Sequence, residues 1–209
     1  QYPELSLCRI VSQEKGLYRI ISAEGDPLAS VSGKFQHEAA SPSDYPVVGD
    51  YVMAALNGGA AVINRVLPRK SLFLRKSAGT ARMEQAVAAN IDTVFICMSL
   101  NNDYNLSRLE RYLSVAWPSR ALPVLILTKS DLCANVLDIL VEISAIAPGV
   151  DIVTTSINDH SSYTDLRSYC KPGVSASFIG SSGVGKSTLI NILAGKELLQ
   201  TAQVGQDDK

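Results

Sequence analysis

The sequence predicts two domains of different fold class: an all-β barrel of the OB-fold type over residues 1–70, and a doubly wound α/β domain over residues 71–209. Three observations predict this division. Short runs of alternating apolar residues fill the first third of the chain, near-continuous apolar strands alternate with helical patterns afterwards, and a glycine-rich loop separates the last strand from the last helix. The change of period places the domain boundary between residues 68 and 80.

The composition is that of a globular protein, with 46% hydrophobic and 19% charged residues. A formal net charge of −1 gives no overall attraction to nucleic acid, so any RNA contact must come from a local patch. The four cysteines include no C-x-x-C pair, which favours small core residues in a reducing compartment over a disulfide framework or a zinc site. They are Cys8, Cys97, Cys133 and Cys170.

The sequence predicts a cytoplasmic protein without membrane association. No apolar run approaches the roughly 18 residues of a membrane span, and no basic-then-apolar leader is seen. The chain begins at Gln1 without a methionine, so we expect the natural N-terminus to have been trimmed.

The first domain is expected to contain five strands, at residues 5–13, 17–23, 28–32, 47–56 and 60–67. Turn sequences such as Gly25-Asp26-Pro27 and Asn57-Gly58-Gly59 separate them. Five short strands without a convincing helix favour an OB-fold barrel. Residues 33–46 would form its longest loop, and His37 within that loop is expected to be a solvated surface residue.

A basic segment follows the predicted barrel. Six basic residues and no acidic one fall between positions 65 and 82. Such a segment can contact RNA phosphates, or it can be a solvated connector, and the sequence favours neither. The candidate RNA contacts are Arg69, Lys70, Arg75 and Lys76.

The second domain shows four rounds of strand and helix. Strands are expected at residues 91–98, 123–127, 151–155 and 174–179, and helices at 103–113, 132–147, 163–170 and from 188 onward. Leu106, Leu109 and Leu113 share one face of the first helix. This alternation predicts a doubly wound parallel sheet, which binds ligands at the carboxyl ends of its strands.

The stretch between the last strand and the last helix fits the phosphate-binding pattern G-x-x-x-x-G-K-[ST]. Its lysine, Lys186, would reach the β- and γ-phosphates, and Ser187 would ligate Mg²⁺; these two are the candidate catalytic residues. The alternative is an ordinary Gly/Ser turn capped by Ser187. The predicted nucleotide contacts in this loop are Gly180, Ser181, Ser182, Gly183, Val184, Gly185, Lys186, Ser187 and Thr188.

Thr128-Lys129-Ser130-Asp131 ends an earlier strand and resembles the N-K-x-D motif that reads guanine. One carboxylate can accept both adjacent donors of guanine, which adenine does not offer, so Asp131 would select the base. Lys129 would lay its stem along the base. Alternatively, Asp131 caps a helix that begins at residue 132. Because Thr128 stands where many GTPases have Asn, we expect a weaker tie between this loop and the phosphate loop.

The next strand ends in Thr155-Ser156-Ile157, where a backbone N–H could meet guanine O6, although Ser156 is equally well explained as a turn residue. Ile157 replaces the small residue usual there. In common GTPases the phosphate loop comes first, whereas here Asp131 and Ser156 precede Gly180. The order therefore predicts a circularly permuted P-loop GTPase domain.

Together with Leu67-Pro68-Arg69-Lys70, Ala89-Asn90-Ile91-Asp92 and Arg108-Leu109-Glu110-Arg111-Tyr112-Leu113, these motifs make the chain resemble the circularly permuted GTPases that depend on the small ribosomal subunit, the RsgA/YjeQ family. The resemblance implies an OB-fold, a permuted GTPase domain and a C-terminal zinc-binding domain. It also implies Mg²⁺-dependent hydrolysis of GTP to GDP and phosphate, stimulated by the 30S subunit during its late maturation. The barrel and basic segment would contact 16S rRNA, and the protein would be a cytoplasmic monomer.

The chain stops at Lys209, before the switch regions, the D-x-P-G loop and the zinc ligands that the resemblance implies. It therefore offers no candidate for positioning the attacking water. Two alternatives remain open at this point: an ATP-dependent P-loop enzyme, and an RNA-binding module whose nucleotide only stabilises the fold.

Overall fold

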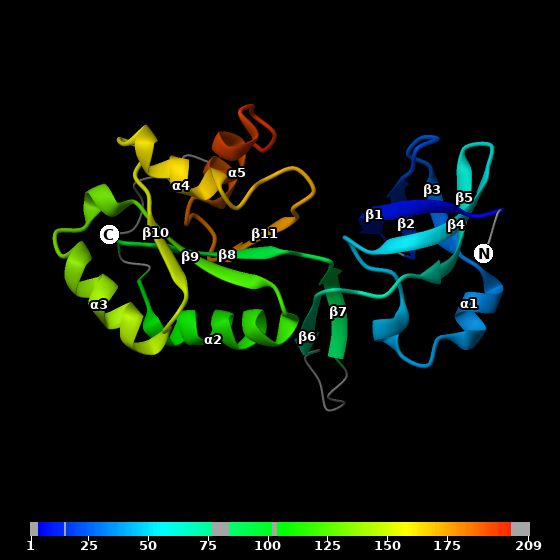
Figure 1. The fold of residues 1–209 in the computed structure, drawn as a ribbon, viewed down its shortest axis with the longest axis horizontal. Coiled ribbons are helices and arrows are strands. Elements are labelled where there is room, and N and C mark those ends of the chain that lie inside the picture. Colours follow the sequence, from blue (N-terminus) through cyan, green and yellow to red (C-terminus); the bar gives the residue numbers. More distant parts are fainter. Residues whose placement is uncertain (1–3, 15, 77–83, 102–103, 202–209) are drawn as a thin grey trace. The chain divides into compact units, whose positions relative to one another are not determined.

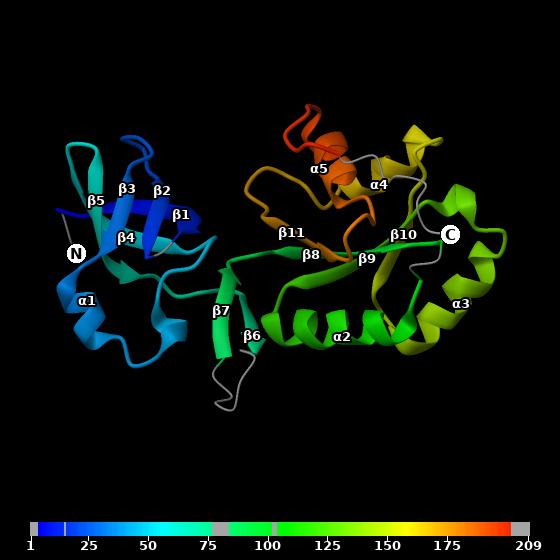
Figure 2. The same cartoon turned by 180° about the vertical axis from the view of Figure 1, so that it is seen from behind.

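The computed structural model describes residues 4–14, 16–76, 84–101 and 104–201. Its residues form two compact units, Gln1–Ile91 and Asp92–Lys209 (Figures 1 and 2). Within the described ranges, no helix is long and apolar enough to cross a membrane.

The first unit contains the predicted barrel. Its strands close in the order β1-β2-β3-β5-β4, with β3 and β5 parallel and the other pairs antiparallel. Alternate residues, among them Ile10, Ile20 and Ile63, point into a closed core, which explains the apolar alternation of the sequence. The OB-fold prediction is confirmed. The strands are β1 (Ser6–Glu14), β2 (Leu17–Ile21), β3 (Leu28–Val31), β4 (Tyr51–Asn57) and β5 (Ala60–Val66).

The prediction that residues 33–46 form a loop was incomplete, because this segment contains the helix α1 (Gly33–Glu38) and the 3₁₀ helix η1 (Pro42–Asp44). Ser32 caps α1 by accepting a hydrogen bond from the Phe35 N–H at 3.1 Å. No residue of α1 is buried, so the helix lacks the apolar stripe by which a helix is read from sequence.

The basic segment is not a bare connector. Strands β6 (Leu72–Lys76) and β7 (Glu84–Ala89) form an antiparallel hairpin within the first compact unit. Leu72 and Leu74 pack against Val47 and Ala89. The two compact units meet between Ile91 and Asp92. The division into domains at residue 70 stays a prediction.

The second unit is built on a four-stranded parallel sheet in the order β10-β9-β8-β11. All seven residues of β8 are buried, as the near-continuous apolar run predicted. The strands are β8 (Thr93–Ser99), β9 (Leu122–Thr128), β10 (Asp151–Thr154) and β11 (Ala176–Gly180).

Helices cover both faces of this sheet, which confirms the doubly wound class. Figure 1 shows α2 and α3 on one face and α4 and α5 on the other, and Figure 2 shows the same arrangement from behind. The loops that follow β9, β10 and β11 meet at one edge because the strands are parallel. The helices are α2 (Leu106–Ala116), η2 (Trp117–Ser119), η3 (Ser130–Leu132), α3 (Val136–Ile146), η4 (His160–Tyr163), α4 (Thr164–Arg167) and α5 (Lys186–Ala194).

Candidate nucleotide-binding site

The predicted phosphate loop runs from the end of β11 to the start of α5. Gly180, Gly183 and Gly185 have φ angles of 152°, 74° and 97°, which side-chain-bearing residues rarely adopt. A Cβ at Gly180 would also lie 2.4 Å from the carbonyl oxygen of Cys97 on the neighbouring strand β8. Glycine at position 180 therefore lets the loop begin close against β8.

Lys186 folds back over this loop. Its Nζ donates hydrogen bonds to the carbonyl oxygens of Gly180, at 2.9 Å, and of Ser181. Ser187 and Thr188 follow in the first turn of α5, where the helix N-terminus carries partial positive charge. The arrangement directs a cation, a helix N-terminus and two hydroxyl residues to one loop, which suits a polyphosphate with its Mg²⁺.

The predicted base-reading loop, residues 128–131, and the predicted phosphate loop, residues 180–188, are joined by a side-chain hydrogen bond. The Thr128 hydroxyl, at the end of β9, donates to the carbonyl oxygen of Val184 at 2.7 Å. Thr128 is buried, so water does not compete for this bond. A tie is therefore present although Thr128 stands where many GTPases have Asn, and the expectation that it is weaker than an asparagine tie stays a prediction.

A pocket of about 240 Å³ lies between these two loops. Its walls come from the ends of β9 and β10, from η4 and from the phosphate loop with α5. They consist of Thr128, Lys129, Asp131, Leu132, Thr155, Ile157, Tyr163, Val184, Gly185, Thr188 and Leu189. The structure thus brings the predicted base-reading residues and part of the phosphate loop around one cavity.

Asp131 stands in this pocket with its carboxylate already oriented. The Ser156 hydroxyl donates to Oδ1 at 2.7 Å, and the Asn158 amide donates to Oδ2 at 3.3 Å. The alternative role as a helix cap does not hold, because α3 begins at Val136 and its N-cap residue is Asn135. Asp131 instead lies in η3 and remains exposed towards the pocket.

Three further residues predicted to contact the base are Ser156, Ile157 and Lys129, and the structure shows a different environment for each. The Ser156 N–H, expected to face guanine O6, donates to the Ser162 hydroxyl at 3.2 Å, so Ser156 contributes by orienting Asp131. Ile157 is 65% exposed and forms an apolar rim. Lys129 adopts a left-handed backbone with φ of 57°, an unusual conformation that is often found at binding sites.

Two titratable groups near the site, Tyr163 and Cys97, have raised pKa values. Burial raises the pKa of the Tyr163 hydroxyl, and the negative charges of Asp131 and Asp159 raise it further. Burial also raises the pKa of the Cys97 thiol to about 12, although the charge of Lys186 acts in the opposite direction. Both groups are therefore neutral near pH 7, and Cys97 behind the loop is a packing residue rather than a nucleophile.

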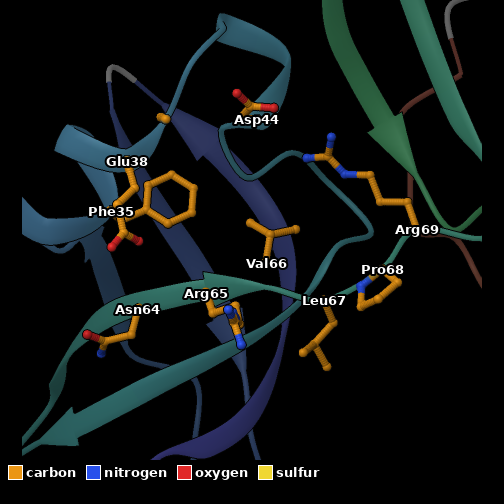
Figure 3. A pocket seen from close by; sticks show the side chains of 10 residues that line it. Phe35, Glu38, Asp44, Asn64, Arg65, Val66, Leu67, Pro68 and Arg69 are labelled. Atoms are coloured by element: carbon orange, nitrogen blue, oxygen red, sulfur yellow. The ribbon is translucent and has the colours of Figure 1, made fainter.

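The predicted RNA contact Arg69 differs from expectation, because its guanidinium is bound within the first unit. It forms a fork on the buried Asp50 carboxylate, with Nε to Oδ1 at 2.8 Å and Nη2 to Oδ2 at 2.7 Å. The same group donates to the carbonyl oxygens of Ser43 and Tyr45. Figure 3 shows Arg69 extending towards the loop that carries Asp44. Arg69 thus cross-links the barrel to its exit segment.

Other residues of the basic segment face solvent. The side chains of Lys70 and Arg75 are exposed. Lys76 is the last residue of β6, and the structure describes its backbone but not its side chain. Arg82 lies outside the described residues. Arg65 lines a surface pocket of about 590 Å³ with Phe35 and Asn64 (Figure 3). Among the described residues, no three His, Cys, Asp or Glu side chains gather as a metal site would require.

The sequence model of the RsgA GTPase family matches residues 66–209. The chain belongs to this family. The match covers β6, β7 and the entire second unit, including both loops of the site. The phosphate loop follows the base-reading loop in the chain, so the permuted order predicted from sequence is the order of the family fold.

Curated relatives extend the likeness into the barrel. Small ribosomal subunit biogenesis GTPase RsgA 2 of Lactiplantibacillus plantarum is 43% identical over 203 residues, which cover 97% of this chain and 57% of the relative. RsgA 1 of Listeria innocua is 40% identical over 200 residues, covering 96% and 56%. The chain thus spans a little over half the length of these relatives.

Solved structures share the fold. YjeQ from Thermotoga maritima superposes with a TM-score of 0.71 at 26% identity, covering 90% of this chain and 65% of that one. YloQ, described as a circularly permuted GTPase, gives a TM-score of 0.65 at 23% identity, covering 91% and 65%.

Sequence reasoning missed three contributors to the site. Asn158 and Tyr163 belong to the segment after β10, which has no recognisable motif, and Arg108 comes from α2. The Arg108 Nη1 donates to the Ser181 hydroxyl of the phosphate loop at 2.6 Å. An arginine three residues after a helix cap carries no signal for this contact, because its partner lies 73 residues further along the chain.

Proposed function

We propose that this chain binds GTP and forms part of a GTPase that acts in maturation of the small ribosomal subunit. The observation that carries the proposal is the joined pair of loops at the sheet edge. Asp131, held by Ser156, faces a pocket whose opposite wall is the phosphate loop, and the Thr128 hydroxyl ties the two together. The names of the curated relatives support the same function.

In this proposal the two ends of the nucleotide are recognised by different chemistry. Asp131 accepts the N1–H and the exocyclic N2–H₂ of guanine, while Lys129 and Ile157 cover the base. Backbone N–H groups between Gly183 and Thr188 bind the phosphates. The remaining contacts predicted from the sequence complete this set: Gly180, Ser181, Ser182, Val184 and Gly185 in the phosphate loop, and Ser130 beside Asp131.

Lys186 would exchange its carbonyl partners for the β,γ-phosphate oxygens, and the Ser187 hydroxyl would hold Mg²⁺. The ion, when bound, neutralises charge that develops on the phosphates during transfer. Lys186 supplies a second positive charge at the same place. Both residues fit these roles because they stand in the first turn of α5, beside the loop.

The test of base recognition is nucleotide competition on the full chain. GDP should displace a fluorescent guanine nucleotide, whereas ADP should not. Asp131→Asn should shift the preference from guanine to xanthine nucleotides, because an amide can donate to the xanthine 2-oxo group. Asp138→Asn, a matched change at an exposed aspartate of α3, should leave the preference unchanged. Equal displacement by ADP and GDP would favour the ATP-dependent alternative.

Turnover tests the second half of the proposal. GTP hydrolysis should accelerate when 30S subunits are added, and Lys186→Ala should abolish the effect. An equal hydrolysis rate with and without subunits would favour the alternative of an RNA-binding module, provided that GTP analogues also leave the affinity for the subunit unchanged.

For the RNA contact, we propose that Lys70, Arg75 and Lys76 meet 16S rRNA phosphates while Arg69 holds the segment through Asp50. The exposure of Lys70 and Arg75 supports this assignment. Charge reversal at Arg75 should weaken binding to the subunit and reduce its salt dependence. An unchanged salt dependence would remove Arg75 from the interface. The proposal also includes a cytoplasmic monomer and a zinc site outside these 209 residues.

A further inference from the structure

Helix α3 presents a row of apolar side chains to solvent. Leu137 and Val141 are 78% and 74% exposed, which makes them the two most exposed large apolar side chains among the described residues. They lie four residues apart and are therefore neighbours on the helix surface. Ile143, on the opposite side of the helix, is fully buried. Neighbouring exposed apolar side chains, unlike scattered ones, mark an interaction surface.

A second row, made of carboxylates, runs beside the apolar row. Asp138 and Glu142 each follow one residue of the apolar row, so the two rows are parallel. Among the described residues, neither carboxylate forms an ion pair with a lysine or arginine. Like charges four residues apart destabilise a helix, so a cationic partner would relieve this repulsion. The Tyr104 hydroxyl donates to Glu142 Oε2 at 2.8 Å, which orients the carboxylate and leaves Oε1 to accept from a partner.

The carboxylate row also lines a groove of about 600 Å³ between α3, η3 and the end of β8. Apolar side chains contribute much of the remaining lining, among them Leu100, Leu132 and Ile139. A lysine or arginine that bonds to the carboxylates can lay its aliphatic stem along these side chains. The surface of α3 therefore offers apolar contact and negative charge together.

The segment of the chain that carries α3 has charge of one sign. Residues 130–166 contain six Asp or Glu residues and no Lys or Arg. Such a segment repels RNA phosphates and acidic lipid headgroups, which disfavours both as partners of α3. Packing α3 of two copies together would place carboxylates against carboxylates, which disfavours a second copy of this chain. Charge complementarity therefore selects a cationic segment of another protein.

We propose that α3 is a docking surface for a basic amphipathic helix of a partner protein. Rows of residues four apart interdigitate when two helices pack, so a partner helix with an apolar row and a neighbouring Lys/Arg row matches both rows of α3. Its apolar row would cover Leu137 and Val141, and its cations would bond to Asp138 and Glu142. The inference does not depend on nucleotide binding, because none of these four side chains lines the nucleotide pocket.

The experiment measures binding of a fluorescently labelled synthetic peptide to the full chain by anisotropy, without nucleotide. The peptide has about 15 residues, enough to span α3 as a helix, with leucine at every fourth position and lysine beside each leucine. A peptide of the same composition in scrambled order is the control. The chain should bind the designed peptide more tightly than the scrambled one, and added salt should weaken this binding.

Variants of α3 test the two rows separately. Leu137→Gln combined with Val141→Gln keeps good helix formers and should weaken peptide binding about tenfold. Asp138→Asn combined with Glu142→Gln should weaken binding and reduce its salt dependence. The matched controls are Val115→Gln on α2 and Asp165→Asn on α4, both at exposed positions, and they should leave the affinity unchanged.

Equal affinity for the designed and scrambled peptides would overturn the proposal, as would unchanged affinity in both double variants. Self-association of the unmodified chain in sedimentation, abolished by the glutamine changes at Leu137 and Val141, would assign the surface to a second copy instead. Peptide binding that disappears in a protein extended to the full length of its relatives would assign the surface to another segment of the same polypeptide. Either result would also overturn the proposal.

Discussion

Replacing Arg69 with methionine should destabilise the barrel unit strongly. The change keeps most of the apolar stem and removes the guanidinium from the Asp50 carboxylate, which is fully buried. Asp50 would keep the Val47 N–H at 2.8 Å but lose both charge-assisted bonds. Removing one partner of a buried pair costs about 3–5 kcal/mol, because a buried charge is left uncompensated. The carbonyl oxygens of Ser43 and Tyr45 also lose their donor.

The assay is urea unfolding followed by two signals. The single tryptophan, Trp117, lies in the second unit, so its fluorescence reports that unit alone. Far-UV circular dichroism also reports the barrel strands. Arg69→Met should therefore lower the urea concentration at the midpoint of a circular dichroism transition, while the midpoint of the Trp117 fluorescence transition should not change. A domain is stable by only about 5–15 kcal/mol, so the expected shift is large.

Two further variants sharpen the result. Arg19→Met, at an exposed arginine of β2, should change stability by less than about 0.5 kcal/mol. Asp50→Asn combined with Arg69→Met should recover part of the lost stability, since no buried charge then remains. A loss below about 1 kcal/mol in Arg69→Met, or no recovery in the double variant, would refute the account of the pair as a buried charge clamp.

Thr128→Val should weaken GDP binding about 5- to 30-fold, because a buried hydrogen bond to Val184 worth about 1–2 kcal/mol is lost. Thr128→Ser keeps the hydroxyl and should bind GDP nearly as tightly as the unmodified chain. Isothermal titration measures both affinities, and equal affinities for the valine and serine variants would contradict the prediction. The hydrogen bond from Tyr169 to Asp151, assisted by burial and nearby negative charge, raises the pKa of the Tyr169 hydroxyl to about 12 from its ordinary 10.0. This contribution to stability is present below the ordinary pKa and is lost as the pH rises towards 12. The free energy of unfolding should fall over this alkaline range, and Tyr169→Phe should flatten the fall; a phenylalanine variant with the same pH profile would argue against the linkage.

Patterns with a simple period led from the sequence to the fold. The alternation in β1 and the unbroken apolar run of β8 each report how many faces of a strand are buried, and both strands lie close to where they were expected. Helix α1 was missed because it buries nothing, and the β6–β7 hairpin was missed because its basic residues resemble a linker. Helix α3 begins later than predicted: Asp131 resembles a helix cap in the sequence, whereas the residue at the N-cap position is Asn135.

In the candidate site, local motifs located the loops but not the bonds between them. The Gly180–Thr188 pattern can be recognised in a sequence because its two fixed glycines, its lysine and its hydroxyl residue each have a defined role in phosphate binding. The contacts of Thr128 with Val184 and of Arg108 with Ser181 cross 56 and 73 residues, and only the strand order brings them together. A single sequence carries no periodic signal for such pairs. From its neighbours alone, each residue is predicted only as part of its own strand or helix.

The strand order also bears on when the site becomes complete as the chain folds. Strands β8 and β9 pair directly and are consecutive in the chain, whereas β11 must return past β9, α3 and β10 to pair Ala176 with Thr93. Closing that long loop is the entropically expensive step. During synthesis, which proceeds from the N-terminus, the base-reading loop emerges well before the phosphate loop. Under the proposed function, a nascent chain would bind phosphate only when nearly the whole sheet is in place, so a nucleotide would bind the completed domain in preference to its precursors.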